Sequence, residues 1–198
     1  MPSNRAVSTV PGARPREEPT GAYVIDPVHS AVGFSVRHGM VSNVRGRFTA
    51  FEGFLRLDAL RPARSEAHVS VQTGSLVTGV RARDYHLTGP DFLDSASFPL
   101  MVFRSTAVVP LGEDRFRMTG NLRLKDVELP LHLDLEHGGT TRDADGRRRI
   151  GFEGSATLRR SDWGLDWNVL LRSGGVLLGD KVRLGLSVSA LRLGPEAP

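Results

Sequence analysis

Polar and ionisable side chains gather most densely between Ser75 and Asp94. Arg83, Asp84 and His86 lie close together there, and two further aspartates follow. A guanidinium, a carboxylate and an imidazole could bind the polar headgroup of a ligand, or act as acid and base on a small substrate. The same groups could instead hold this segment against a neighbouring strand through charged hydrogen bonds. Of these alternatives, the structural role is favoured.

Histidines are the other candidates for chemistry, because imidazole is a common metal ligand. His68 and His132 fall on the polar phase of strand-like segments and His137 ends one, so all three are expected to face solvent. The remaining histidines have no spacing that would bring them together on one strand or helix: His29, His38 and His86. We therefore predict no metal site and no cofactor.

Signatures of other catalytic sites are missing from the sequence. There is no Gly-x-Ser-x-Gly elbow, no phosphate-binding loop and no dinucleotide fingerprint. The chain has no cysteine, which excludes thiol nucleophiles, thiolate metal sites and disulfides. The sequence predicts that the protein is not an enzyme. An enzyme that acts on a small hydrophobic substrate near Arg83, Asp84 and His86 is the least favoured alternative.

The composition is that of an ordinary globular protein of one domain. Of 198 residues, 39% are hydrophobic and 24% are charged. The formal net charge is +4 and the basic side chains are almost all arginines, spread evenly along the chain. No basic stripe is interleaved with aromatic residues, so binding to nucleic acid is not expected.

The two ends differ from the segment between them. Residues 1–20 contain four prolines and few apolar side chains, so we expect a disordered tail. Residues 21–193 form the predicted domain, and residues 194–198 are expected to be flexible. We see no secretory signal and no apolar stretch that could span a membrane. The sequence therefore predicts a cytoplasmic protein without stable membrane insertion.

Alternation of apolar and polar residues dominates the domain and predicts strands with one buried face. The phase slips between Phe48 and Phe51, which indicates a bulge or sharp bend near Gly53. Connections are short, so neighbouring strands are expected to be antiparallel. We predict an all-β fold, an eight-stranded antiparallel barrel of lipocalin type, and favour it over a sandwich because closure leaves no exposed edge.

One segment interrupts the alternation. Residues 78–94 are expected to form a short helical cap over one barrel end, with Thr78 capping its start and Gly89-Pro90 stopping it. Phe92-Leu93 is expected to form a second turn.

Small residues on the inward phase suggest that the barrel is incompletely filled. They alternate with bulky ones at Gly46, Gly53, Gly120, Gly154 and Ala156. Unfilled volume would leave room for a ligand, whereas glycines at barrel bends would explain the pattern equally well. The inward side chains expected to line a tunnel are Phe34, Val36, Phe48, Phe51, Val69, Val71, Met118, Leu122, Phe152 and Leu184.

Taken together and in order, these segments resemble the YceI-like family of bacterial polyisoprenoid-binding proteins. The most specific piece is Arg83-Asp84-Tyr85-His86-Leu87, followed by Asp91–Asp94 and Phe98-Pro99. The other matching pieces are His29–His38, Gly46–Phe48, Ser75–Gly79, Phe103–Thr106, Gly120–Leu122, Arg160–Asp162 and Gly179–Val182. The resemblance implies a lipocalin-like barrel whose tunnel takes an isoprenoid or similar amphiphile, often as a homodimer.

From the residues and the resemblance together, we expect a protein that carries, stores or sequesters a long-chain isoprenoid lipid. The polar end of the ligand is expected at a barrel mouth formed by His38, Arg83, Asp84, His86 and Trp163. The main alternative is a filled barrel without ligand, closed by Phe34, Phe48, Phe51 and Met118, which would act as an interaction or stress-response module.

Overall fold

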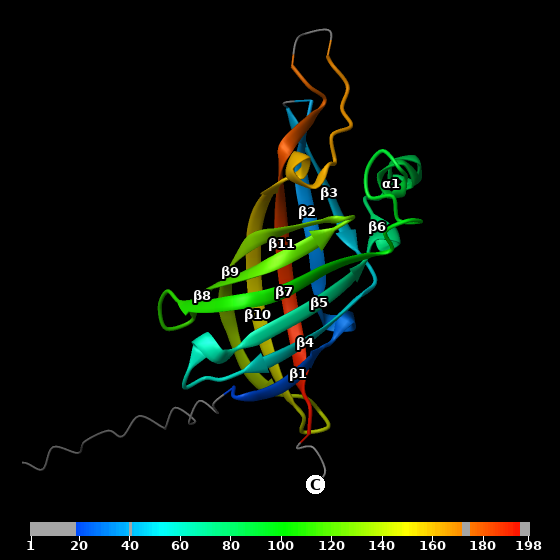
Figure 1. Cartoon of the computed structure of the whole chain (residues 1–198). Coiled ribbons are helices and arrows are strands. Elements are labelled where there is room, and N and C mark those ends of the chain that lie inside the picture. The colour runs from blue at the N-terminus through cyan, green and yellow to red at the C-terminus, as the bar shows by residue number, and fades with distance from the viewer. Residues whose placement is uncertain (1–18, 40, 172–174, 195–198) are drawn as a thin grey trace, which may run out of the picture.

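The computed structural model describes residues 19–39, 41–171 and 175–194, and this part of the chain forms one antiparallel sheet (Figure 1). Its strands are β1 (Gly21–Ile25), β2 (Ala31–His38), β3 (Ser42–Phe48), β4 (Phe51–Leu57), β5 (Glu66–Gln72), β6 (Leu76–Val77), β7 (Leu100–Pro110), β8 (Arg115–Leu124), β9 (Val127–Arg142), β10 (Arg148–Arg159) and β11 (Leu178–Arg192). The helices are α1 (Arg81–Thr88) and four short 3₁₀ turns, η1 (Pro27–His29), η2 (Pro62–Arg64), η3 (Thr73–Ser75) and η4 (Arg160–Trp163).

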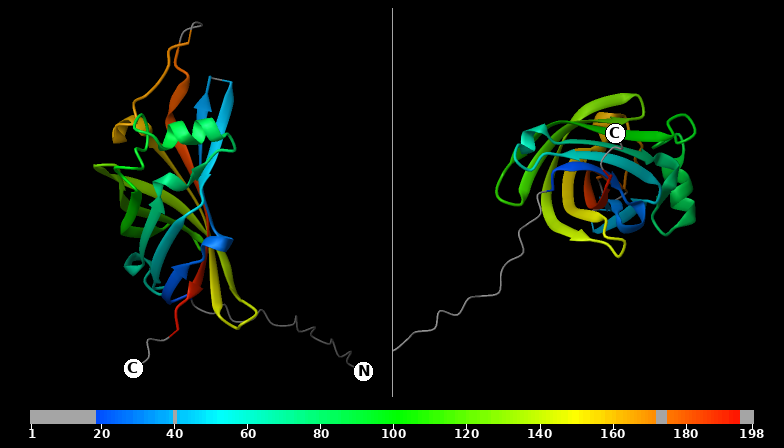
Figure 2. Two further views of the ribbon diagram at one scale, coloured as in Figure 1. Left: turned by 90° about the vertical axis from the view of Figure 1, so that its right-hand side faces the viewer. Right: turned by 90° about the horizontal axis from the view of Figure 1, so that it is seen from below.

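Eight of the strands close into a barrel, which confirms the predicted fold. Their order is β1-β4-β5-β7-β8-β9-β10-β11, and β11 pairs back with β1 through Tyr23↔Arg192, Val24↔Leu191 and Ile25↔Ala190. The strands β2, β3 and β6 extend the sheet beyond the barrel from the other half of β11. Figure 2 shows the strands wrapped around one axis, with α1 beside them. Closure satisfies the backbone groups that an open edge would expose.

The two ends of the barrel are built differently. One end carries α1, η4 and the β8–β9 turn, and we call it the closed end. The other end carries the β4–β5 connection, the β7–β8 turn and the β9–β10 turn, and we call it the open end. No described helix is long and apolar enough to cross a membrane.

A corner between β1 and β2 turns the chain from the barrel into its extension. The Asp26 carboxylate accepts hydrogen bonds from Arg149 Nη1 and His29 Nδ1, both at 2.7 Å. Arg149 Nη1 also donates to Ser189 Oγ at 2.7 Å, so the corner is fastened to both β10 and β11. The hydrogen bond from Arg149 outweighs the effect of burial, and together with those from His29 and the Val28 backbone it lowers the pKa of Asp26 to about 2.

The phase slip near Phe48 is a break between two strands. β3 ends at Phe48 and β4 begins at Phe51, whereas Gly53 lies regularly within β4 opposite Val69. The break is held by Ser75, whose backbone oxygen accepts from Thr49 N and whose Oγ accepts from Ala50 N, each at 3.1 Å. The expected bend is therefore present, and the expected bulge at Gly53 is not.

The helical cap is present, but its start differs from the prediction. The N-cap residue of α1 is Val80, and its side chain makes no capping hydrogen bond. Thr78 instead donates from its backbone N and its Oγ1 to Asp84 Oδ1, at 2.8 and 2.5 Å. At the other end Gly89 is the C-cap residue, and the following turn is closed by Phe92 N donating to Gly89 O, as predicted.

Side chains fill the closed half of the barrel. Trp163 is only 3% exposed, and its Nε1 donates to Leu122 O at 3.2 Å. It belongs to a buried cluster that also includes Phe48, Leu76, Leu124, Leu131 and Leu158. The side chains of this part of the cluster therefore occupy the barrel interior around Trp163.

The inward glycines do not leave the empty volume that their size suggested. A Cβ on Gly46 would lie 2.4 Å from the Phe34 ring, one on Gly120 would lie 2.4 Å from the Phe103 ring, and one on Gly53 would lie 2.5 Å from Ile25. Large neighbouring side chains therefore already occupy the space over these glycines. Any cavity must come from another part of the sheet.

Candidate ligand cavity

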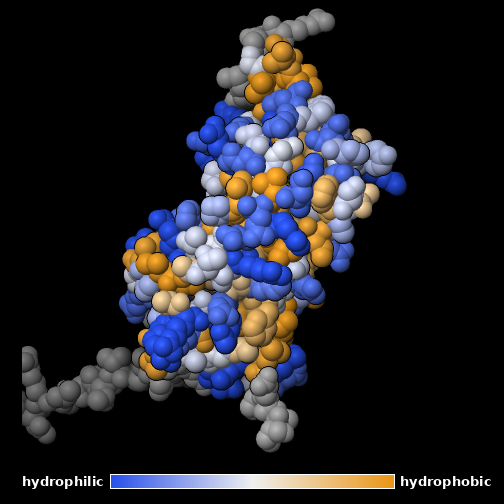
Figure 3. Space-filling model, in the orientation of Figure 1, coloured by the Kyte–Doolittle hydropathy of each residue, from blue (hydrophilic) through white to orange (hydrophobic). Residues whose placement is uncertain are grey.

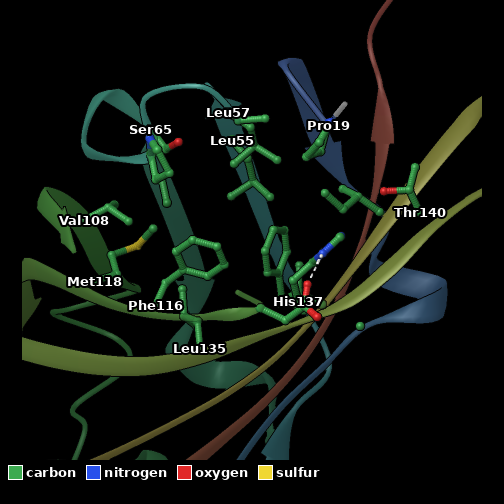
Figure 4. Close-up of a pocket in the computed structure, with 18 of the residues that line it drawn as sticks. Pro19, Leu55, Leu57, Ser65, Val108, Phe116, Met118, Leu135, His137 and Thr140 are labelled. Carbon is green, nitrogen blue, oxygen red and sulfur yellow. Dashed lines mark ion pairs between the residues drawn. The ribbon is translucent and has the colours of Figure 1, made fainter. Parts of the chain in front are cut away.

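A cavity of about 1160 Å³ occupies the open half of the barrel (Figure 4). Its inner wall is apolar and consists of Ile25, Leu55, Leu57, Ala67, Val69, Phe103, Val108, Phe116, Met118, Leu133, Leu135, Ile150, Phe152, Leu186 and Val188. These side chains come from all eight barrel strands and from the inward phase of each. The volume exceeds the roughly 300–1000 Å³ of most small-molecule sites, so the cavity is large enough for a long aliphatic ligand.

Polar side chains surround the cavity only toward the open end. Asp58 and Ser65 come from the β4–β5 connection, and Glu113 and Asp114 come from the β7–β8 turn. The end of β9 adds Thr140, Thr141 and Arg142. The described lining residues therefore carry three carboxylates and one guanidinium. This arrangement gives an apolar pocket with a polar, acidic rim.

His137 is a partly buried polar side chain of this rim. It lies on the same inward phase of β9 as Leu133 and Leu135, and its side chain is 20% exposed. Its Nδ1 is 3.5 Å from Asp114 Oδ1, the contact drawn dashed in Figure 4, and its backbone N donates to Asp114 O at 2.7 Å. Its Nε2 is buried and has no hydrogen-bond partner among the described residues.

A bulge in β9 lets His137 and Thr140 face the same cavity. Phe152 of β10 lies opposite His137, whereas the preceding Gly151 lies opposite Gly139, so Gly138 is an extra residue. Such a bulge shifts the alternation by one residue, and Thr140 lies opposite the inward-facing Ile150. Gly139 has φ +112°, a conformation that side chains rarely adopt. The bulge therefore concentrates polar groups at the rim.

Sequence reasoning placed His137 in solvent, and this was wrong. The signal that would have found it is the alternation itself, since Leu129, Leu131, Leu133 and Leu135 lead directly to His137 on one phase. The carboxylates of the rim gave no comparable signal, because they lie in turns.

Three of the ten predicted tunnel residues line the cavity: Val69, Met118 and Phe152. Six of the other seven belong to the packed core or contact it, and Val36 lies outside it on β2. Of these, Phe48, Val71 and Leu122 are buried, and Phe34, Val36, Phe51 and Leu184 are partly buried. Their inward orientation agrees with the alternation, but their neighbours fill the space in front of them. The closed half of the barrel is thus filled by side chains, as in one of the two predicted alternatives, and the open half is hollow, as in the other.

None of the residues predicted to form the mouth lines the cavity: His38, Arg83, Asp84, His86 and Trp163. They belong to the closed end and to the strand extension beyond it. His38 ends β2 opposite Ser42 and Leu178. The segment 78–94 lies at the end opposite the cavity, so the structure does not bring these residues to its mouth.

The polar groups of that segment hold the cap in place. Arg83 donates from Nε to Thr78 Oγ1 at 2.8 Å and from Nη2 to Thr78 O at 3.1 Å. Asp84 accepts from the same threonine. These contacts match the structural alternative, in which charged hydrogen bonds fasten the cap next to a strand.

His86 is likewise engaged within the closed end. Its Nε2 lies 2.9 Å from Asp91 Oδ2, and its ring packs edge-on against Trp167 and Phe92, at 4.6 and 5.1 Å between centroids. Within the described part of the chain, no group of three or more histidine or acidic side chains is arranged to hold a metal ion.

Comparison with known proteins agrees with this architecture. The family model of the YceI-like domain matches residues 23–190. A UPF0312 protein of Pseudomonas savastanoi pv. phaseolicola is 37% identical over 145 residues, which are 72% of this chain and 76% of that protein.

Two solved structures have the same fold. The YCEI protein of Campylobacter jejuni is 26% identical with a TM-score of 0.67, over 80% of this chain and 90% of that one. A polyisoprenoid binding domain from Saccharophagus degradans is 16% identical with a TM-score of 0.66, over 86% of this chain and 98% of that one.

Proposed function

Since this chain belongs to the YceI-like domain family, we propose that it binds a long-chain isoprenoid or similar amphiphile in the cavity at the open end. The single observation that carries the proposal is the apolar cavity of about 1160 Å³ with a polar rim. A polyisoprenoid binding domain of the same fold supports the choice of ligand class.

The geometry suits an aliphatic chain held by burial. Each methylene group transferred from water to such a wall contributes about 0.8 kcal/mol, and a single neutral hydrogen bond contributes about 1 kcal/mol net. Affinity should therefore come mainly from the tail of the ligand. The expected roles are carrying, storing or sequestering the lipid, with no chemical step.

Native ligand gives the most direct test. Protein purified from its own cells is extracted with organic solvent, and the extract is analysed by mass spectrometry. We expect an isoprenoid or another long-chain amphiphile at a stoichiometry near one per chain. Absence of any lipid, together with no uptake of a C20 prenol probe, would contradict the proposal.

A pair of substitutions tests whether the cavity is the binding site. Val108 is buried on the cavity wall, whereas its neighbour Val109 is 53% exposed on the outside of β7. Val108→Trp should fill part of the cavity and displace at least two methylene groups of the ligand, which lowers affinity about tenfold. Val109→Trp, the matched control, should leave affinity unchanged. Affinity is measured by displacement of Nile red with geranylgeraniol.

Equal affinities of the two variants would place the ligand elsewhere, and would favour the alternative of an interaction module without ligand in the cavity. Thermal unfolding of both variants shows whether either has lost its fold.

We also propose that the protein forms a homodimer. Val41, Val169, Leu170 and Val176 are exposed apolar residues of the segments beyond the closed end, where Leu170 pairs with Val176. Figure 3 shows hydrophobic residues gathered near the upper tip of the molecule. Apolar groups gathered in this way are a common feature of protein interfaces. Light scattering coupled to size-exclusion chromatography measures the mass directly.

A further inference from the structure

The imidazole of His137 is an unsatisfied hydrogen-bonding group on the cavity wall. Its Nδ1 faces the Asp114 carboxylate at 3.5 Å, while its Nε2 is buried without a partner among the described residues. A carboxylate can only accept, so in the neutral ring the proton belongs on Nδ1 and Nε2 keeps its lone pair. A buried acceptor of this kind is costly unless a donor reaches it.

The charges around His137 disfavour an anion. The described lining residues supply the carboxylates of Asp58, Glu113 and Asp114, and one guanidinium, that of Arg142. Sites that bind phosphate or carboxylate groups usually surround them with cationic side chains or clusters of backbone N–H groups. Asp58 is paired with Arg61, whose Nε lies 3.2 Å from Asp58 Oδ2. A negative headgroup would still approach the carboxylates of Glu113 and Asp114, whereas an uncharged one would meet no such repulsion.

On the premise that the cavity holds an amphiphile, as proposed above, we propose that it selects an uncharged headgroup with an O–H or N–H donor. Long-chain alcohols, phenols and primary amides belong to this class. The donor of the headgroup bonds to His137 Nε2 at the rim, and the tail lies against the apolar wall beyond it. Amphiphiles that end in a phosphate or carboxylate are disfavoured.

Three probes with the same kind of tail separate the headgroup from the tail. They are geranylgeraniol, geranylgeranyl phosphate and the branched C20 alkane phytane, each measured by displacement of Nile red from the full chain. We expect the alcohol to bind about fivefold more tightly than the alkane, the effect of one neutral hydrogen bond. The phosphate should bind at least about tenfold more weakly than the alcohol, because of the like charges at the rim.

Three variants test the role of His137. His137→Leu should remove the fivefold preference for the alcohol over the alkane and leave alkane binding intact, which also shows that the cavity is still folded. His137→Gln keeps a side-chain acceptor and should retain the preference. His132→Leu, the matched control, changes an exposed histidine on the outer face of β9 that contacts Thr119, and should behave as wild type.

The outcomes separate this inference from the proposed function. If the wild type binds none of the probes, the proposed function fails and the headgroup preference fails with it. If the probes bind but the phosphate binds as tightly as the alcohol, or His137→Leu keeps the preference, only the headgroup inference is overturned.

Discussion

Asp26 carries the clearest acid sensitivity among the single residues of this protein. Its side chain is 12% exposed, and the pKa of its carboxyl falls from 3.8 to about 2 in the folded chain. A depressed pKa means that the charged form stabilises the fold above about pH 4. This contribution is lost progressively as the pH falls from about 4 toward 2. We expect Asp26→Asn to lower the free energy of unfolding by about 1–2 kcal/mol at pH 6.

Urea unfolding between pH 2 and pH 6 measures this effect. The difference between wild type and Asp26→Asn should narrow as the pH falls toward 2. Asp134→Asn serves as the control, because Asp134 and its partner Arg117 are both at least half exposed and exposed ion pairs are strongly screened. A difference for Asp26→Asn that stays constant down to pH 2 would contradict the assignment.

At this same scale, sequence reasoning succeeded for the wall and failed for the rim. Val69, Met118 and Phe152 follow from alternation, because a strand with one buried face repeats every two residues. The segment 78–94 resembled a ligand site because charged residues are concentrated there. Arg83 and Asp84 are instead hydrogen-bonded to Thr78. The rim residues Asp58, Glu113 and Asp114 come from separate turns that only the tertiary fold brings together, so residue spacing did not predict them.

The cap at the closed end is the element whose role can be tested most simply. His86 joins α1 to the segment after η4 through Trp167, and it lies at the end opposite the cavity. His86→Ala should therefore destabilise the fold by about 1 kcal/mol, a fall in Tm of about 2–4 °C, without changing the affinity for geranylgeraniol. Calorimetry and Nile red displacement give the two readings. A large loss of affinity at unchanged Tm would return His86 to the binding machinery.

Strand β8 shows how the sheet depends on one missing side chain. A Cβ on Gly120 would lie 2.4 Å from both Arg104 O and the Phe103 ring, so the backbone of β7 itself would have to move. Gly120→Ala is expected to destabilise the fold by more than about 2 kcal/mol.

Gly185 on β11 offers a matched comparison, because no atom lies within 4 Å of the position of its Cβ. Gly185→Ala should be neutral or slightly stabilising, since alanine loses less backbone entropy in a strand than glycine does. Chemical denaturation of both variants measures the free energy of unfolding. A similar loss of stability in the two variants would argue against the tight packing over Gly120.

Prediction of the elements depended on how local their determinants are. The alternating strands and the stop of α1 at Gly89 follow from neighbouring residues. The start of the helix does not, because the Thr78 side chain is turned to Asp84 by the tertiary arrangement and Val80 takes the cap position. The break at Phe48 was visible as a phase slip, but its nature depended on Ser75, which is distant in sequence.

At the scale of the whole molecule, closure was predictable and filling was not. Eight segments with one apolar face and short connections can hide their edges by forming a barrel. Whether the interior is solid depends on which side chains meet across it, and single strands do not report this. Phe103 over Gly120 and Phe34 over Gly46 occupy space that looked empty in the sequence.

The packing of the closed half of the barrel limits the route by which a lipid could reach the cavity. With Trp163 and its neighbours buried behind the cavity, the lipid proposed to bind there would enter through the open end. The lipid would have to leave through the same opening by which it entered. A protein that takes up and releases lipid through one opening, as proposed here, has no built-in direction of transport, so net transfer would run toward the site that binds the lipid more tightly.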